Sequence, residues 1–385
     1  MSLTLDSVGK TYDGERTLVD VDLTVDDGEF CVVVGPSGCG KTTLLNCIAG
    51  LVRPDEGDVR RDGESLLDVP VNEREFGVVF QDFEDRLFPH MTVAENVAFG
   101  LRQRGSYDEG AIDERVDEIL EMLAISETRD DHPANLSGGQ QQRVELARQL
   151  VRDAETLLLD DPLSDLDYKL QKRVELELRR LHDSEGDTIV YVTHNQDQSL
   201  KLADRIVVMN RGTVEQVAPP AEVYHEPATA FVARFLGDSN LLVTDAARDD
   251  GPSTRVETAA GAIRAAGSRD AERDDEQNGE SGGERDGGVV LVRPEDVDFG
   301  DGENAVTGVL EQRIYTGELT EFVVSLAGST QEFRLQQAGD VRLDAVGAAV
   351  GDRVTLSWDV EDTHYFAPDE LSATSDVAAA DLEAV

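Results

Sequence analysis

Nine consecutive residues near the start of the chain combine the residue types and the spacing that bind a nucleoside triphosphate. A glycine, four further residues and then Gly-Lys-Thr form the P-loop pattern, with an apolar run before it and a helix-like run after it. The backbone N–H groups of such a turn surround the β-phosphate, and the dipole of the following helix adds positive potential. The lysine ammonium lies between the β- and γ-phosphates, and the threonine hydroxyl is placed to ligate Mg²⁺. The predicted nucleotide-binding residues are Gly35, Pro36, Ser37, Gly38, Cys39, Gly40, Lys41, Thr42 and Thr43.

Polar side chains also close three apolar runs that have the length and composition of buried strands. Kinases, GTPases, helicases and transport ATPases all carry a P-loop, so the P-loop alone does not identify the activity. These further positions are needed to decide among the four classes. In a parallel sheet the carboxyl ends of the strands form the edge at which ligands bind. The residues that end these runs are Gln81, Asp160, Asp161 and His194.

The order of the predicted elements indicates an α/β domain over residues 1–236. Residues 2–8 and 18–25 alternate apolar and polar side chains, which predicts an antiparallel β subdomain with a turn at residues 10–14. Residues 93–151 have mostly helical spacing, which predicts a helical subdomain. Strands that alternate with helices around these segments predict a core of parallel sheet, and therefore a P-loop NTPase nucleotide-binding domain.

The pattern changes after residue 236. Short alternating runs between Gly and Asp turns predict an all-β, OB-like barrel domain over residues 237–372. Residues 268–288 contain no apolar side chain larger than alanine and are rich in charged residues and glycine, which predicts a disordered insertion. Residues 373–385 are expected to form a flexible tail.

The composition is strongly acidic. The chain has 35 basic and 80 acidic residues and a formal charge of −45, which opposes binding to a nucleic-acid phosphate backbone. Only five of the basic residues are lysines, and the acidic residues are dense from end to end. This composition resembles that of proteins from microbes that keep molar salt in their cytoplasm, so we expect a halophilic protein.

Cysteine usage and hydropathy indicate a cytoplasmic protein. The three cysteines, Cys31, Cys39 and Cys47, lie eight residues apart, which fits neither a disulfide set nor a metal site. All three are expected to be reduced thiols. No apolar run long enough to span a membrane and no signal pattern at residues 1–10 is evident.

Residues 1 to about 235 resemble the nucleotide-binding subunit of ABC transporters. The resemblance rests on the P-loop together with Gln81, the segment from Leu136 to Gln140, the segment from Leu157 to Asp160, and His194. It implies that a signature segment at a helix N-terminus closes on the γ-phosphate held by a second copy, so that hydrolysis needs two domains sandwiched head to tail. The residues of this segment are Ser137, Gly138, Gly139 and Gln140.

The same resemblance assigns roles to single residues. Asp160 would hold Mg²⁺ through water, Gln81 would contact the metal and the nucleophilic water, and His194 would contact the γ-phosphate as a switch histidine. Tyr12 lies where the family stacks the adenine ring. Asp167 matches the aspartate of the family's next motif, which reads Ser164-Asp165-Leu166-Asp167 in this chain.

One position departs from the family pattern. A glutamate, the presumed general base, usually follows the Mg²⁺ aspartate, but this chain has Asp161 there. We expect Asp161 to serve as the base with a side chain one methylene shorter, and the departure leaves the rate of hydrolysis open. Asp165 is a further difference, since the family usually has a small apolar residue at this position.

The C-terminal β-rich part resembles the TOBE domain of importer ATPases, through the segments Val292-Arg293-Pro294-Glu295-Asp296-Val297 and Tyr315-Thr316-Gly317. The resemblance implies import of a sugar, polyamine, iron, sulfate, molybdate or thiamine. Residues 87–93 and 237–242 are most similar to the polyamine and iron branches.

These resemblances imply a subunit that hydrolyses ATP with Mg²⁺ at the cytoplasmic face of the cell membrane. Its expected partners are permease subunits, a second copy or a close homologue, and indirectly an extracellular solute-binding protein. One alternative is a soluble ABC ATPase that acts as a conformational clamp in DNA repair or translation. Another is a ligand-binding regulatory role of the C-terminal domain in addition to transport.

Overall fold

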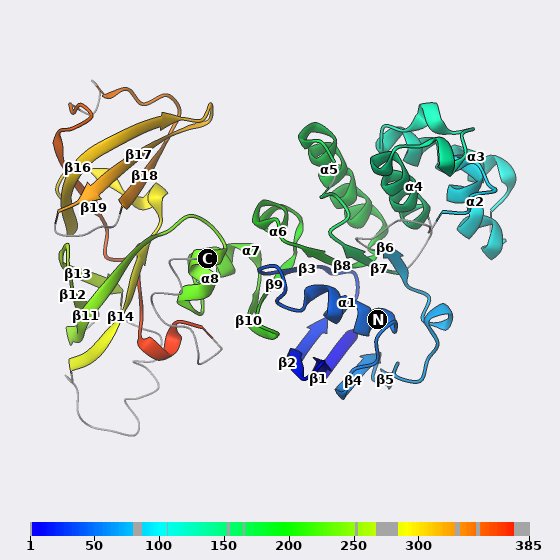
Figure 1. The fold of residues 1–385 in the computed structure, drawn as a ribbon, viewed down its shortest axis with the longest axis horizontal. Helices are drawn as coiled ribbons and strands as arrows, with labels where there is room; N and C mark the ends of the chain where they lie inside the picture. Colours follow the sequence, from blue (N-terminus) through cyan, green and yellow to red (C-terminus); the bar gives the residue numbers. More distant parts are fainter. Residues whose placement is uncertain are drawn as a thin grey trace. The chain divides into compact units, whose positions relative to one another are not determined.

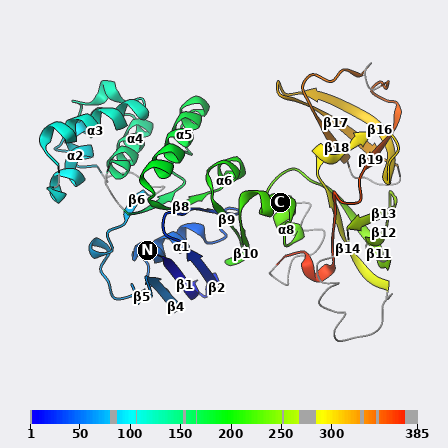
Figure 2. The same ribbon diagram turned by 180° about the vertical axis from the view of Figure 1, so that it is seen from behind.

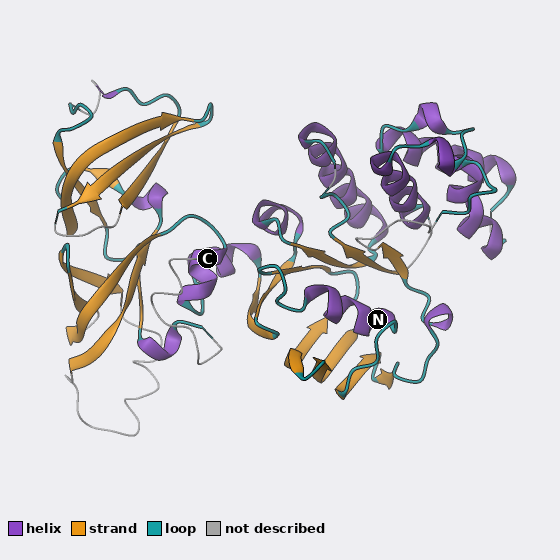
Figure 3. Cartoon of the chain, viewed as in Figure 1, coloured by secondary structure: helices purple, strands orange, loops and turns teal. Residues whose placement is uncertain are grey.

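The computed structural model describes residues 2–79, 87–105, 107–151, 155–164, 166–250, 253–266, 284–327, 332–343 and 347–372. The chain divides into two compact units, Met1–Val223 and Tyr224–Val385, and each is described separately. Figure 1 and Figure 2 show the ribbon from opposite sides, and Figure 3 separates helices from strands by colour.

A six-stranded sheet forms the centre of the first unit, in the order β10-β9-β3-β8-β7-β6. The strands from β9 to β6 are parallel, and β10 is antiparallel to β9. The parallel arrangement brings the P-loop, Asp160 and Thr193 to the same carboxyl edge, as the sequence predicts. The strands are β3 (Phe30–Val34), β6 (Gly77–Val79), β7 (Thr156–Asp160), β8 (Thr188–Thr193), β9 (Arg205–Asn210) and β10 (Thr213–Ala218).

A four-stranded antiparallel sheet has the order β2-β1-β4-β5. The predicted turn at residues 10–14 is wrong over its first three residues, because Tyr12 still pairs with Glu15. Asp13 and Gly14 alone make the turn, with φ of 50° and 87°. Such a two-residue turn follows the twist of the strands, so the ladder continues to its end. The strands are β1 (Leu3–Tyr12), β2 (Glu15–Val25), β4 (Glu56–Arg61) and β5 (Glu64–Ser65).

Helices cover both faces of the six-stranded sheet (Figures 1 and 2). Helix α1 lies between the two sheets, where Leu44, Leu45 and Ile48 are fully buried in one hydrophobic cluster. Each such side chain contributes about 1.5–3 kcal/mol by leaving water. The helices are α1 (Lys41–Ala49), α2 (Val93–Arg104), α3 (Glu109–Met122), α4 (Gly138–Leu150), α5 (Tyr168–Glu185), α6 (Gln196–Leu202) and α7 (Pro220–His225).

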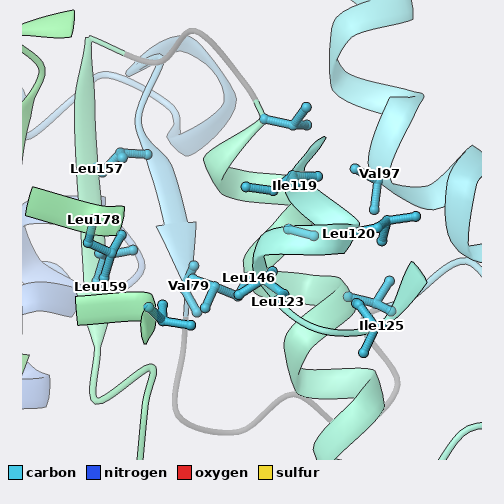
Figure 4. Close-up of a cluster of buried hydrophobic side chains, with 14 of the residues drawn as sticks. Val79, Val97, Ile119, Leu120, Leu123, Ile125, Leu146, Leu157, Leu159 and Leu178 are labelled. Atoms are coloured by element: carbon cyan, nitrogen blue, oxygen red, sulfur yellow. The ribbon is translucent and has the colours of Figure 1, made fainter. Parts of the chain in front are cut away.

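A second hydrophobic cluster fills the opposite face, between the sheet and helices α2 to α6. Figure 4 shows residues of this cluster: Val79, Leu157 and Leu159 from the strands, Leu146 of α4 next to Val79, and Leu120 of α3. The sheet is therefore buried on both faces, which explains why its strands are continuous apolar runs.

Two five-stranded antiparallel sheets form the second unit, in the orders β13-β12-β11-β14-β20 and β15-β19-β16-β17-β18. One core joins them, with Leu242 and Val290 from one sheet and Phe322 and Leu356 from the other. The predicted all-β C-terminal domain is confirmed. Its elements are α8 (Ala230–Phe235), β11 (Asn240–Asp250), β12 (Ser253–Thr258), β13 (Gly261–Ala266), β14 (Glu284–Val292), β15 (Asp298–Phe299), β16 (Asn304–Tyr315), β17 (Leu319–Leu326), β18 (Glu332–Ala338), β19 (Arg353–Trp358) and β20 (Thr363–Phe366).

The predicted disordered insertion, residues 268–288, is wrong at its C-terminal end. Residues 284–288 belong to β14, where Gly288 pairs with Thr244 and Glu284 with Arg248. Backbone pairing with β11 holds this segment although it lacks large apolar side chains. Residues 268–283 lie outside the described residues.

Arg293 explains why the second unit begins at residue 224, before the expected boundary at 236. The residue is 5% exposed, and its guanidinium donates to the carbonyl oxygens of Ala233 and Tyr224. The same group lies 4.2 Å from the centroid of the Tyr224 ring. A buried arginine needs such partners, so it fixes α8 to the β-rich core.

The charge imbalance predicts salt-dependent stability. With a net charge of −45, repulsion between like charges opposes the compact state. This repulsion extends over about 10 Å at 0.1 M salt but only over about 3 Å at 1 M salt, so it weakens as salt is added. The melting temperature, measured by calorimetry, should rise steeply with KCl between these limits. Sucrose at matched osmolality is the control, because it does not screen charge. A flat curve in KCl would refute the halophilic expectation.

Candidate functional site

The P-loop links the buried strand β3 to helix α1 and is packed tightly against its neighbours. A Cβ atom on Gly35 would lie 2.2 Å from the carbonyl oxygen of Met209, and one on Gly40 would lie 2.6 Å from that of Thr17. Gly40 also has a φ of 104°, which side chains rarely adopt. These contacts permit only glycine and hold the amides of the loop in a fixed curve.

Lys41 and Cys39 have different roles in this loop. The Lys41 ammonium donates to the carbonyl oxygens of Gly35 (2.7 Å) and Pro36 (2.9 Å) and is thus held against the loop. Burial raises the pKa of the Cys39 thiol, although the nearby lysine acts against this effect. Cys39 is therefore a neutral packing residue, and all three cysteines are free thiols, as predicted.

Two oxygen groups meet beside the loop. The Thr42 hydroxyl lies 3.3 Å from Oδ1 of Asp160, which β7 brings to the first turn of α1. Asp160 is 2% exposed. Among the described residues, no group of three or more metal-ligating side chains forms a closed cage. An open pair of oxygens suits Mg²⁺, which usually takes one or two protein ligands and completes its shell with water and phosphate oxygens.

Asp161 follows directly and is held at both carboxylate oxygens. Its Oδ2 accepts from His194 Nδ1 at 2.6 Å, and its Oδ1 accepts from the Thr193 hydroxyl at 3.1 Å. The Asp161 backbone has a φ of 46°, which aspartate and asparagine tolerate better than most residues. Its amide donates to the carbonyl oxygen of Val192 at 2.7 Å, so the turn is fixed to β8.

A buried polar network supports Asp161 from behind and involves residues that the sequence analysis did not select. The Thr193 hydroxyl also lies 3.0 Å from Gln198 Oε1, which accepts from the Tyr191 hydroxyl at 3.0 Å. Burial raises the pKa of Tyr191 well above its usual value, so this hydroxyl remains a donor. The signal in the sequence is slight: Tyr191 and Thr193 flank Val192 at the end of a strand that also begins with a threonine.

The signature segment forms the N-terminus of α4. Ser137 caps this helix through two reciprocal bonds. The Ser137 amide donates to Gln140 Oε1 at 2.9 Å, and the Gln140 amide donates to the Ser137 hydroxyl oxygen at 3.4 Å. Ser137 and Gly138 are exposed. The unbonded amides of the first helical turn and the helix dipole make this end able to bind an anion.

The remaining predicted site residues are not joined to this cluster by any contact that we describe. Asp167 caps α5 by accepting from the Leu170 amide at 3.2 Å. Tyr12 is 43% exposed at the end of β1, with the Lys10 ammonium 5.4 Å from its ring centroid. Gln81 lies outside the described residues.

The site and the fold together define a class of protein. The sequence profile of the ABC transporter family matches residues 18–164, and that of the TOBE domain matches residues 290–366. The chain belongs to the ATP-binding proteins of ABC transporters, and it is an ATPase of the importer type.

Particular relatives resemble it over nearly their whole length. The spermidine/putrescine import ATP-binding protein PotA of Thermobifida fusca is 40% identical over 373 residues, which cover 94% of this chain and 93% of that protein. The protein of the same name from Thermotoga maritima is 36% identical over 370 residues, which cover 94% and 96%. The ATP-binding cassette MJ0796, solved as a dimer in a post-hydrolysis state with ADP and Pi, is 35% identical with a TM-score of 0.52, over 57% of this chain and 98% of that chain.

No helix among the described residues has the length and hydropathy needed to cross a bilayer.

Proposed function

We propose that this chain powers the import of a polyamine such as spermidine or putrescine, by hydrolysing ATP at sites shared between two copies docked on a membrane permease. The Asp161–His194 pair beside the P-loop is the observation that carries the chemistry. The choice of polyamine is supported by the PotA relatives, which match both the nucleotide-binding domain and the TOBE domain. A clamp in DNA repair or translation has no comparable support.

The residues at the sheet edge have separate tasks. Lys41 and the loop amides bind the phosphates, and Thr42 and Asp160 hold Mg²⁺. The bound metal supplies positive charge for the phosphate oxygens. Asp161 takes a proton from the attacking water, whose oxygen forms a bond to the γ-phosphorus while the bond to the bridging oxygen of ADP breaks. A carboxylate has about four acceptor positions, so Asp161 can accept from a water while it keeps its present partners.

His194 is suited to sense the γ-phosphate. Its side chain is 62% exposed, whereas that of Asp161 is 9% exposed. Nδ1 faces Asp161, and Nε2 is the ring atom left for a phosphate oxygen. His194 therefore couples the presence of the γ-phosphate to the carboxylate. Gln81 is proposed to contact the metal and the water, and Tyr12 the adenine.

The second half of each site comes from another copy in this proposal. Ser137 and Gly138 are exposed at a helix end that attracts anions, and the MJ0796 cassette was solved as a dimer. A head-to-tail dimer would place this end of one copy against the γ-phosphate of the other. Docking on a permease would place the dimer on the cytoplasmic face of the membrane, with an external solute-binding protein as indirect partner.

The solute can be tested by uptake in the cell that makes this protein. Deletion of its gene should abolish uptake of labelled spermidine or putrescine and leave uptake of iron(III) and maltose unchanged. A plasmid copy of the parent gene should restore uptake, and a copy with Lys41→Ala should not. Unchanged polyamine uptake together with lost uptake of another solute would overturn the choice of polyamine, but not the ATPase assignment.

A further inference from the structure

Thr193 occupies a position that the proposed reaction does not yet use. It is the last residue of β8, directly before His194, and it is 0% exposed. Its hydroxyl contacts Asp161 Oδ1 at 3.1 Å and Gln198 Oε1 at 3.0 Å, and it accepts from the Asn195 amide at 3.0 Å. No other side chain that we describe bonds Oδ1 of Asp161.

A hydroxyl has one hydrogen and two acceptor positions, which limits how these contacts can be satisfied. The Asn195 amide uses one acceptor position. The hydrogen can serve either Asp161 or Gln198, and Gln198 Oε1 already accepts from Tyr191. While Asp161 is a carboxylate, the hydrogen is needed there. Once Asp161 holds a proton, Thr193 can accept from the acid and turn its own hydrogen to Gln198. The Thr193 hydroxyl can therefore bond Asp161 in both of its states, as a donor to the carboxylate and as an acceptor from the acid.

The two partners of Asp161 differ in exposure. His194 is exposed and, in the proposed reaction, contacts the γ-phosphate. Thr193 is enclosed by the strand and by α6, and its neighbour Gln198 is 2% exposed. When the bond to His194 is lost, Thr193 is the one side chain among the described residues that still bonds the carboxylate. The orientation of Asp161 matters because a carboxylate on a single methylene reaches the water only in a narrow range of orientations.

We propose that Thr193 is a positioning residue for hydrolysis: its hydroxyl, held by the Asn195 amide, donates to Asp161 and orients the carboxylate toward the attacking water. This inference rests on the proposed role of Asp161 as the base. Thr193 itself touches neither ATP nor water in this account.

The test is steady-state ATP hydrolysis by the purified full chain in molar KCl. Thr193→Val keeps the shape and removes the hydroxyl, and it should lower kcat by about 10-fold or more and change the KM for ATP by less than about 2-fold. Thr193→Ser should restore kcat to near the parent value. Thr193→Ala is a second variant without the hydroxyl, should the valine protein not fold.

A matched control lies in the same strand. Thr188 is also buried, and its hydroxyl oxygen accepts from the Gly28 amide at 3.0 Å, with no link to Asp161. Thr188→Val should lower the melting temperature as Thr193→Val does and leave kcat unchanged. An equal loss of kcat in both variants, a loss that serine does not restore, or a parent kcat in Thr193→Val would each overturn the inference.

Asp161→Asn, measured in parallel, distinguishes a failure of the role proposed for Thr193 from a failure of the role proposed for Asp161 as the base. If Asp161→Asn is inactive and Thr193→Val hydrolyses normally, Asp161 remains the base and only the role of Thr193 fails. If Asp161→Asn hydrolyses at the parent rate, both assignments fail.

Discussion

Asp161→Asn is expected to bind ATP as tightly as the parent protein and to hydrolyse it at least about 100-fold more slowly, because a positioned general base contributes about 10²–10⁴-fold to the rate. Asparagine preserves the size of the side chain and tolerates the φ of 46° at this position, so the turn should stay intact. ATP should then hold the dimer closed. Single-turnover hydrolysis and gel filtration with ATP measure the two effects.

Asp161→Glu is the matched control for this prediction. Glutamate restores the residue that the family usually has and extends the carboxylate by one methylene, so the variant should match or exceed the parent rate. Hydrolysis by Asp161→Asn at the parent rate would show that Asp161 is not the base and that His194 or another group carries the step.

Lys41→Ala and Ser137→Arg are expected to fail at different steps. Removal of the Lys41 ammonium deletes charge-assisted bonds to the phosphates, which should weaken ATP binding by about 10- to 100-fold or abolish it. Ser137→Arg changes a residue outside the P-loop, so binding to one copy should remain nearly intact. Its bulk and charge should block the γ-phosphate site of the partner copy and stop hydrolysis. Fluorescent-nucleotide titration and phosphate release separate binding from hydrolysis.

Ser137→Arg also removes the N-terminal cap of α4, and a substitution in helix α2 controls for this loss. Thr92 caps α2 with the same reciprocal bonds, here to Glu95, but lies outside the signature segment. Thr92→Arg should destabilise its helix to a similar extent and retain hydrolysis. Full activity of a strictly monomeric Ser137→Arg protein would refute the shared site.

The sequence predicts the P-loop well because its function depends on neighbouring residues. Gly35, Gly40 and Lys41 must occupy fixed positions along one short segment, so their spacing carries the information. Asp160 and His194 are also predictable, since each stands at the end of a short and largely apolar run of strand length. Parallel order then places them at one edge.

The network behind Asp161 is not predictable in this way. Asp161 directly follows β7 and Thr193 ends the neighbouring strand β8, and their bond depends on the register in which Asp160 pairs with Val192. A threonine at a strand end is common, and nothing in its neighbours shows which carboxylate it contacts.

Some strands also have no clear alternation of apolar and polar residues in the sequence. Strand β10 mixes half-buried and buried polar residues, and β13 consists largely of alanine and glycine, so neither sequence has a clear alternation. They are strands because a partner strand pairs with their backbones. The same cause placed residues 284–288 in β14 against the expectation of disorder.

The shared site is tested most directly by mixing two inactive variants. In a head-to-tail dimer of Lys41→Ala with Ser137→Arg, one site carries both changes and the other carries neither. Random mixing should therefore restore single-turnover hydrolysis to at most about a quarter of the parental sites, because half of the dimers are mixed and each has one intact site. Native mass spectrometry verifies that mixed dimers form. If they form and release no more phosphate than either variant alone, Lys41 and Ser137 do not act across two copies, and the account is contradicted.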